Sequence, residues 1–233
     1  MKIKIYADGA KINDMFSAYD KKIISGFTTN PTLMKKAGIT DYLQFAETVL
    51  NKIKDMPISF EIFSDNFEEM YEQAKKLSNL GDNVYVKIPV TKTTGEFSGD
   101  LIRRLDSEDV KMNITAVFTT LQVQSILENI NTNNSHIISV FAGRIADTGV
   151  NPIAIMRTSL DLIKSHNQNL QLLWASSREV LNVYQAEKIG CDIITVTSAL
   201  LNKLKLKNKN LDEYSLETVK MFYDDAEKAG YEL

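Results

Sequence analysis

The chain alternates short strand-like runs with longer helix-like stretches, and this alternation constrains its fold more than any other feature of the sequence. The strand-like runs are five to eight residues long and rich in Val, Ile or aromatic residues, as buried strands are. They cover residues 3–7, 24–28, 58–63, 84–90, 110–117, 136–141, 170–175 and 192–196. Between them, the apolar spacing of amphipathic helices recurs at residues 41–54, 67–80, 120–130, 152–165 and 178–189. The sequence therefore predicts repeated parallel βαβ units.

Eight such units without an internal boundary predict one α/β domain over residues 1–233, folded as a (β/α)8 TIM barrel. Residues 214–230 predict an additional C-terminal helix outside the eight units, reached through a solvated connection at residues 203–210. An open, doubly wound sheet is the alternative fold. It is typically marked by a glycine-rich phosphate loop after the first strand, whereas the first turn here, ADGAK, has a single glycine.

Composition excludes several classes of protein. The formal net charge of −3 gives no basic surface for nucleic acid, and no apolar run approaches the length of a membrane span. We therefore expect neither nucleic acid nor a membrane among the partners. The single cysteine excludes an internal disulfide, which fits a cytoplasmic location. The two histidines stand in no metal-ligand spacing, so we expect no metal site.

One lysine stands inside an otherwise apolar strand. The side chains of a barrel strand alternate between the surrounding helices and the interior. In VYVKIPV (84–90) the first two valines and the isoleucine form the side that faces the helices, which turns Lys87 inward. Burying an ammonium group is unfavourable unless it is paired or loses its proton. A buried amine without its proton is a nucleophile; an ion pair with a carboxylate that stabilises the barrel is the alternative.

Further polar residues stand within or just after the other strand-like runs, where a barrel assembles its active site. These residues are Asp8, Thr29, Asn30, Glu61, Asn113, Thr115, Ser139, Arg144, Ser176 and Arg178. Taken one at a time, each is equally well explained as a helix cap, a turn residue or a surface charge. Taken as a set, they are expected to surround a single site.

The set also has a coherent chemistry. Two arginines and a serine bind a phosphate or a carboxylate well. A buried lysine with carboxylic acid–base partners suits carbonyl chemistry through an imine. The residues alone therefore indicate a class I aldolase-type enzyme that acts on a sugar phosphate.

Six segments, in order along nearly the whole chain, resemble the transaldolase family. They are GFTTNPT (26–32), VYVKIPVT (84–91), NITAVFT (113–119), SVFAGRIADTG (139–149), WASSREV (174–180) and IGCD (189–192). The resemblance implies a (β/α)8 barrel that transfers a dihydroxyacetone unit between sugar phosphates, with neither a metal nor an organic cofactor. Sugar phosphates are then the expected partners, and the sequence leaves open whether the chain forms a homo-oligomer.

The resemblance also implies a role for each matching residue. Lys87 is expected to form the Schiff base, and Asp8 to act as acid and base on the C4 hydroxyl of the sugar. Glu61 and Thr115 are expected to handle a catalytic water. The expected substrate contacts are Asn30, Asn113 and Ser139 for hydroxyl groups and Arg144, Ser176 and Arg178 for the phosphate.

Two alternatives stand beside transaldolase. A fructose 6-phosphate aldolase shares the scaffold but releases free dihydroxyacetone, and a non-catalytic barrel would keep the arginines without the chemistry. Phe141 and Glu61 resemble the transaldolase residues at positions where the aldolases have Tyr and Gln. We therefore expect transfer from fructose 6-phosphate or sedoheptulose 7-phosphate to glyceraldehyde 3-phosphate or erythrose 4-phosphate, through Lys87.

Overall fold

Eight parallel strands close into a barrel within residues 2–131 and 133–232, the part of the chain that the computed structural model describes. Consecutive strands pair with one another, and β8 pairs with β1 from Lys4↔Ile193 to Asp8↔Thr197. The strands are β1 (Lys4–Asp8), β2 (Gly26–Thr28), β3 (Ile58–Glu61), β4 (Val84–Pro89), β5 (Met112–Val117), β6 (Ile137–Val140), β7 (Gln171–Trp174) and β8 (Ile193–Thr197). The predicted (β/α)8 TIM barrel is confirmed, and each predicted run overlaps one of these strands.

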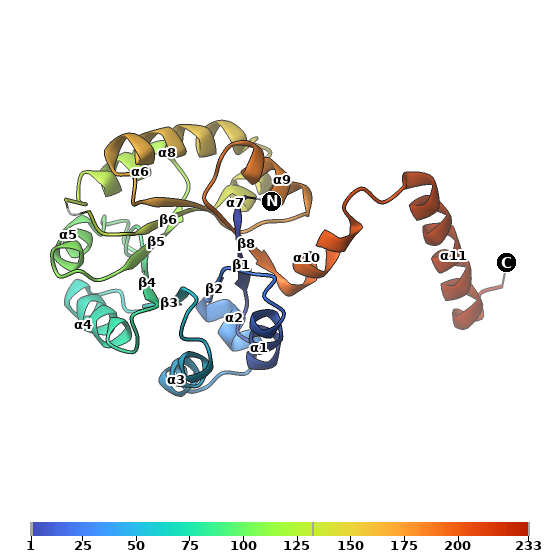
Figure 1. Ribbon diagram of the computed structural model, residues 1–233, viewed down its shortest axis with the longest axis horizontal. Helices are drawn as coiled ribbons and strands as arrows, with labels where there is room; N and C mark the ends of the chain where they lie inside the picture. The colour runs from blue at the N-terminus through green and yellow to red at the C-terminus, as the bar shows by residue number, and fades with distance from the viewer. Residues whose placement is uncertain (1, 132, 233) are drawn as a thin grey trace. The chain divides into compact units, whose positions relative to one another are not determined.

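Helices alternate with the strands, and most of them cover the outside of the barrel (Figure 1). They are α1 (Ile12–Asp20), α2 (Pro31–Lys36), α3 (Tyr42–Lys52), α4 (Phe67–Ser78), α5 (Gly99–Ser107), α6 (Thr120–Leu127), α7 (Ala142–Asp147), α8 (Ile153–His166) and α9 (Leu181–Lys188). None of the described helices is both long enough and apolar enough to cross a membrane.

The five predicted helices between strands correspond to α3, α4, α6, α8 and α9. Helix α9 begins at Leu181 and not at residue 178, because the backbone N–H groups of Arg178 and Glu179 both donate to Asn182 Oδ1 in a turn before the helix. Gly190 follows this helix with φ 81°, as expected for a helix stop. The sequence pattern does not predict α1, α2, α5 and α7, which have only six to nine residues each and so show little periodicity.

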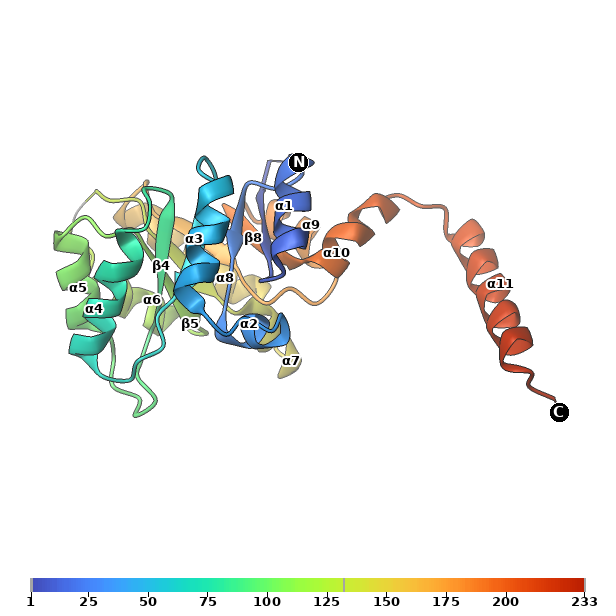
Figure 2. The same cartoon turned by 90° about the horizontal axis from the view of Figure 1, so that it is seen from below.

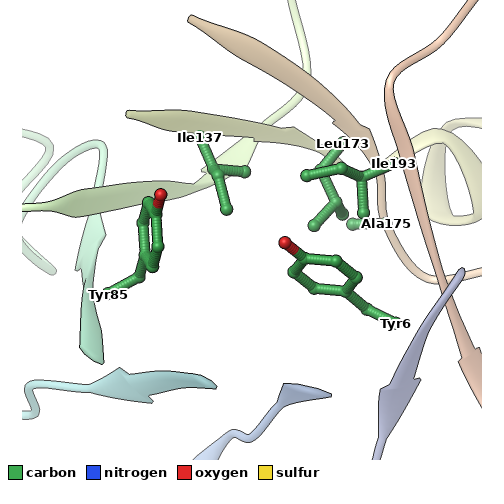
Figure 3. Packing of buried hydrophobic residues seen from close by; sticks show 6 residues of the cluster. All are labelled: Tyr6, Tyr85, Ile137, Leu173, Ala175 and Ile193. Carbon is green, nitrogen blue, oxygen red and sulfur yellow. The ribbon is translucent and has the colours of Figure 1, made fainter. Parts of the chain in front are cut away.

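Side chains fill the barrel interior below its carboxyl end. The layer contains Tyr6, Tyr85, Ile137, Leu173, Ala175 and Ile193, which point toward one another in Figure 3. Tyr6 and Tyr85 stand two residues before Asp8 and Lys87 on the same strand faces, so the layer forms a floor beneath these polar side chains. Strand β2 makes room for the Tyr6 ring with Gly26, where a Cβ atom would lie 2.7 Å from a ring carbon.

From Asn202 onward, the described chain forms a second compact unit. Helix α10 (Ser198–Lys203) precedes the stretch predicted as a connection, residues 203–210, and shares only Lys203 with it, whereas the 3-10 turn η1 (Leu204–Leu206) lies within that stretch. Helix α11 (Leu211–Ala229) is the predicted C-terminal helix; Asn210 caps its start, and Gly230, with φ 66°, ends it. That the barrel and this unit form a single domain over residues 1–233 stays a prediction.

Candidate active site

A cavity of about 590 Å³ opens at the carboxyl ends of the strands. In Figure 2 this is the end of the barrel at which α2 and α7 lie, since these helices directly follow β2 and β6. Every strand contributes a lining side chain: Asp8, Thr28, Glu61, Lys87, Thr115, Ser139, Leu173 and Thr195. The segments after the strands add Asn30, Phe141, Arg144, Ser176 and Arg178. Most of the predicted site residues therefore meet around one cavity, as strand ends do in barrels.

Lys87 lies on the inner face of β4 and is 6% exposed. Its Nζ donates to Glu61 Oε2 at 2.7 Å and to the Thr29 carbonyl at 2.8 Å. Glu61 is the register neighbour of Lys87 on β3, so the two inward side chains lie side by side. The ion pair that the sequence leaves as an alternative is thus present. It is also compatible with chemistry, because a carboxylate at hydrogen-bond distance can take a proton from the amine.

Asp8 ends β1 and takes part in a chain of hydroxyl groups. Thr28 Oγ1 donates to Asp8 Oδ1 at 2.8 Å and lies 2.6 Å from Thr195 Oγ1. Because Thr28 gives its single proton to Asp8, Thr195 must donate to Thr28. Burial raises the pKa of Asp8, while the charge of Lys87 and the hydrogen bond from Thr28 act in the opposite direction. A raised pKa suits a carboxyl group that has to take and return a proton near neutral pH.

Thr115 lines the cavity from β5, and its buried hydroxyl has no hydrogen-bond partner among the described residues. The strand is irregular here, because its register with β6 shifts between Ile114 and Val117, and Ala116 has φ 59°. Such irregularities re-aim side chains next to active sites. The unpartnered hydroxyl offers a donor and an acceptor to a water molecule or a substrate group.

Thr29 and the three residues predicted to bind hydroxyl groups divide into two sets. Asn30 and Ser139 line the cavity, and Asn30 also caps α2 with its Oδ1. Thr29 and Asn113 lie behind the lining, in the barrel wall. Thr29 donates to the Ser59 carbonyl at 2.9 Å. Asn113 donates to Ser59 Oγ at 3.0 Å and accepts from Ser139 Oγ at 2.6 Å, so it connects β3 to β6 and orients Ser139.

Two guanidinium groups and a hydroxyl lie at the mouth of the cavity. Arg144 comes from α7, and Ser176 and Arg178 follow β7. Arg178 Nη1 donates to Ser176 Oγ at 3.0 Å. The Phe141 ring lies 5.8 Å from the Arg144 guanidinium and 5.7 Å from the Phe118 ring. This arrangement offers an anionic group of a ligand both positive charge and hydrogen-bond donors.

Known proteins are similar to this chain along nearly its whole length. The family described as transaldolase/fructose-6-phosphate aldolase matches residues 5–233. The chain belongs to this family. Among its relatives, a probable transaldolase of Thermoplasma volcanium is 33% identical over 213 residues, which are 91% of each chain. A probable transaldolase of Clostridioides difficile is 30% identical over 91% of this chain and 95% of the relative.

Among solved structures, a dihydrodipicolinate synthase from Rhodopseudomonas palustris matches with a TM-score of 0.61. The match covers 96% of this chain and 79% of the synthase, at 13% identity. At that identity the likeness supports the barrel fold alone. Family membership, by contrast, identifies the protein as an enzyme of the transaldolase or aldolase type.

Two lining hydroxyls of this family member, Thr28 and Thr195, lie outside the set that the sequence predicts. Both stand at inward positions of strands, as Lys87 does, and a polar residue at such a position is the signal that finds them. Within the described residues, no three His, Cys, Asp or Glu side chains gather as metal ligands.

Proposed function

We propose that the protein is a transaldolase that moves a dihydroxyacetone unit between sugar phosphates through a Schiff base on Lys87. The observation that supports this most is the buried Lys87 amine, which lies in the cavity 2.7 Å from Glu61. Asp8 supplies a second carboxylate to the same cavity. An amine with these two neighbours suits imine formation followed by cleavage of a nearby carbon–carbon bond.

Imine formation begins when Glu61 takes a proton from Lys87 Nζ. The neutral amine attacks the C2 carbonyl of the ketose phosphate and forms a carbinolamine. Glu61 returns the proton to the departing hydroxyl, which leaves as water. The unpartnered Thr115 hydroxyl can hold that water, since it lines the cavity. Hydrolysis at the end of the cycle runs through the same steps in reverse.

Carbon–carbon cleavage depends on Asp8. Its carboxylate takes the proton of the C4 hydroxyl, the C3–C4 bond breaks, and the bonding electrons pass to the iminium. With fructose 6-phosphate as donor, the aldose that leaves is glyceraldehyde 3-phosphate. The three-carbon enamine stays on Lys87 and adds to erythrose 4-phosphate, and hydrolysis releases sedoheptulose 7-phosphate. Asp8 returns its proton to the new C4 hydroxyl.

The phosphate of donor and acceptor is assigned to Arg144, Arg178 and Ser176, which line the cavity mouth. Binding energy from this remote group orients the sugar carbons along the axis from the mouth to Lys87. The same cations serve both substrates in turn, because each aldose phosphate carries its phosphate at the end away from the reacting aldehyde.

The proposal is tested by incubating the protein with fructose 6-phosphate and erythrose 4-phosphate. We expect sedoheptulose 7-phosphate and glyceraldehyde 3-phosphate in equal amounts, measured by mass spectrometry. Release of free dihydroxyacetone without the seven-carbon product would make the protein an aldolase. Binding of the sugar phosphates without either product would make it a non-catalytic barrel.

Phe141 is expected to keep transfer ahead of free dihydroxyacetone release. Its ring packs against Phe118 and the buried floor and offers no hydrogen-bond donor to the three-carbon enamine. A phenol at this position would hold a water or donate a proton, which quenches the enamine. Phe141→Tyr is therefore expected to raise dihydroxyacetone release from fructose 6-phosphate relative to transfer. Phe63→Tyr adds the same phenol at an exposed site and serves as the control. A Phe141→Tyr protein with lower stability and an unchanged ratio would show that the ring only packs.

Thr28→Val is expected to move the acid limb of the kcat/KM profile to higher pH. The hydrogen bond from Thr28 lowers the pKa of Asp8, so its loss raises that pKa further. Asp8 takes the C4 hydroxyl proton only when ionised, and the rate therefore rises as the pH passes its pKa. Thr28→Ser keeps the donor and is expected to keep the wild-type profile. An acid limb at the same pH in both variants would contradict this role of Thr28.

A further inference from the structure

Helix α7 is held against the end of β7 by a close backbone contact. Gly143 N–H donates to the Ala175 carbonyl at 3.3 Å. A Cβ atom at position 143 would lie 1.6 Å from the Ser176 carbonyl oxygen, so this position accepts only glycine. Ser176 itself has φ 63°, in the left-handed region. The contact fixes α7, with Arg144 in it, relative to the segment that carries Arg178.

Asp147, the last residue of α7, accepts hydrogen bonds from one edge of the Arg178 guanidinium. Arg178 Nε donates to Asp147 Oδ1 at 2.9 Å and to Oδ2 at 3.2 Å, and Nη2 also donates to Oδ2. Nη1 donates to Ser176 Oγ at 3.0 Å instead. Asp147 is not among the residues that line the cavity, whereas Arg178 and Ser176 are. The Asp147 carboxylate therefore does not contact the cavity itself and can act on it through its hydrogen bonds to Arg178.

The ion pair between Arg178 and Asp147 is expected to contribute little to the stability of the fold. The Arg178 and Asp147 side chains are 46% and 52% exposed, and exposed pairs contribute little to the free energy of unfolding. What the pair does fix is the direction of a long side chain, because a carboxylate on the Nε edge defines the plane of the guanidinium. The hydrogen bonds and the charge of Arg178 hold the pKa of Asp147 below its ordinary value, and the charge of Arg144 acts on the same carboxylate in the same direction.

We propose that Asp147 is a positioning residue for the substrate phosphate: it holds Arg178 by its Nε edge and keeps the Nη1 edge turned to Ser176 and the cavity. This rests on the proposed function, which assigns Arg144 and Arg178 to the phosphate. A guanidinium held before binding loses less side-chain freedom when the anion arrives. The contrary reading is that Asp147 competes with the phosphate for Arg178 and weakens binding.

The test measures binding of inorganic phosphate by calorimetry, together with kcat and KM for fructose 6-phosphate, in Asp147→Asn and Asp147→Ala. We expect the phosphate dissociation constant and KM to rise together, roughly tenfold for alanine. Asparagine keeps one acceptor oxygen and is expected to lose less. Because Lys87, Glu61 and Asp8 are untouched, kcat and borohydride trapping of dihydroxyacetone on Lys87 are expected to stay near wild type. Asp161→Asn removes the same charge from an exposed position of α8 and serves as the control.

Each other result has a distinct meaning. Tighter phosphate binding in both Asp147 variants would overturn positioning in favour of competition. Unchanged phosphate binding in both variants, with weaker binding in Arg178→Ala, would overturn the role of Asp147 and keep the phosphate site. Unchanged binding in Arg178→Ala as well would reject the phosphate assignment itself. Should the alanine variant unfold, the asparagine variant alone decides between positioning and competition, since it differs from Asp147 by a single atom type.

Discussion

Lys87→Ala is expected to lower transfer activity to background, a loss on the order of 10⁴-fold or more, as for other covalent nucleophiles. No other amine lies at the floor of the cavity among the described residues, where Lys87 Nζ contacts Glu61 and the Thr29 carbonyl. In the wild-type protein, borohydride added with fructose 6-phosphate is expected to leave a three-carbon adduct on Lys87, located by peptide mass spectrometry. An adduct elsewhere, or none while turnover persists, would reject the imine mechanism.

Two further variants separate chemistry from folding in this experiment. Lys36 also lines the cavity but is exposed on α2, and Lys36→Ala is expected to form the same adduct on Lys87. Removing Lys87 leaves the Glu61 carboxylate without its ion-pair partner, which is itself destabilising. The double variant Lys87→Met, Glu61→Gln removes both charges and is expected to recover thermal stability without recovering activity.

Arg178→Ala is expected to raise KM for fructose 6-phosphate roughly a hundredfold, because hydrogen bonds to a charged group contribute about 1.5–3 kcal/mol each. The KM for unphosphorylated fructose is expected to change little, since no anion then occupies the mouth of the cavity. Steady-state kinetics with both sugars make the comparison. Arg157→Ala, which removes an exposed arginine of α8, is the control. A similar effect on both sugars would show that Arg178 acts on the fold and not on the phosphate.

The barrel follows from the sequence because its strands are short, buried and separated by regular intervals. The inward direction of Lys87 follows from the alternation in VYVKIPV, and its place among the residues that line the cavity confirms that direction. The ion pair with Glu61 depends on the register between β3 and β4, which no local pattern specifies. Short helices such as α7 are fixed by backbone contacts, of which Gly143 against Ser176 is one, and leave little trace in apolar spacing.

The site follows from the sequence to the extent that strand ends must converge. Whether a residue lines the cavity or lies behind its wall depends on the side to which its side chain points where the strand ends. The sequence pattern does not specify that side for residues just after a strand. Thr28 and Thr29 are neighbours, yet Thr28 reaches Asp8 while Thr29 donates to the Ser59 carbonyl in the wall. Asp147 lies one helical turn after Arg144, and only the packing of α7 on β7 brings it to Arg178.

The fit of the Tyr6 ring over Gly26 restricts the order in which substitutions can accumulate in this barrel. The two residues are direct neighbours in the β1–β2 register, and a Cβ atom at position 26 would overlap the ring. Enlarging position 26 first creates a clash, and trimming position 6 first leaves a void, which for a buried aromatic costs about 3–5 kcal/mol. Exchanging both preserves volume. Homologous barrels with a larger residue at position 26 are therefore expected to carry a smaller one at position 6, so that the two positions covary as a pair.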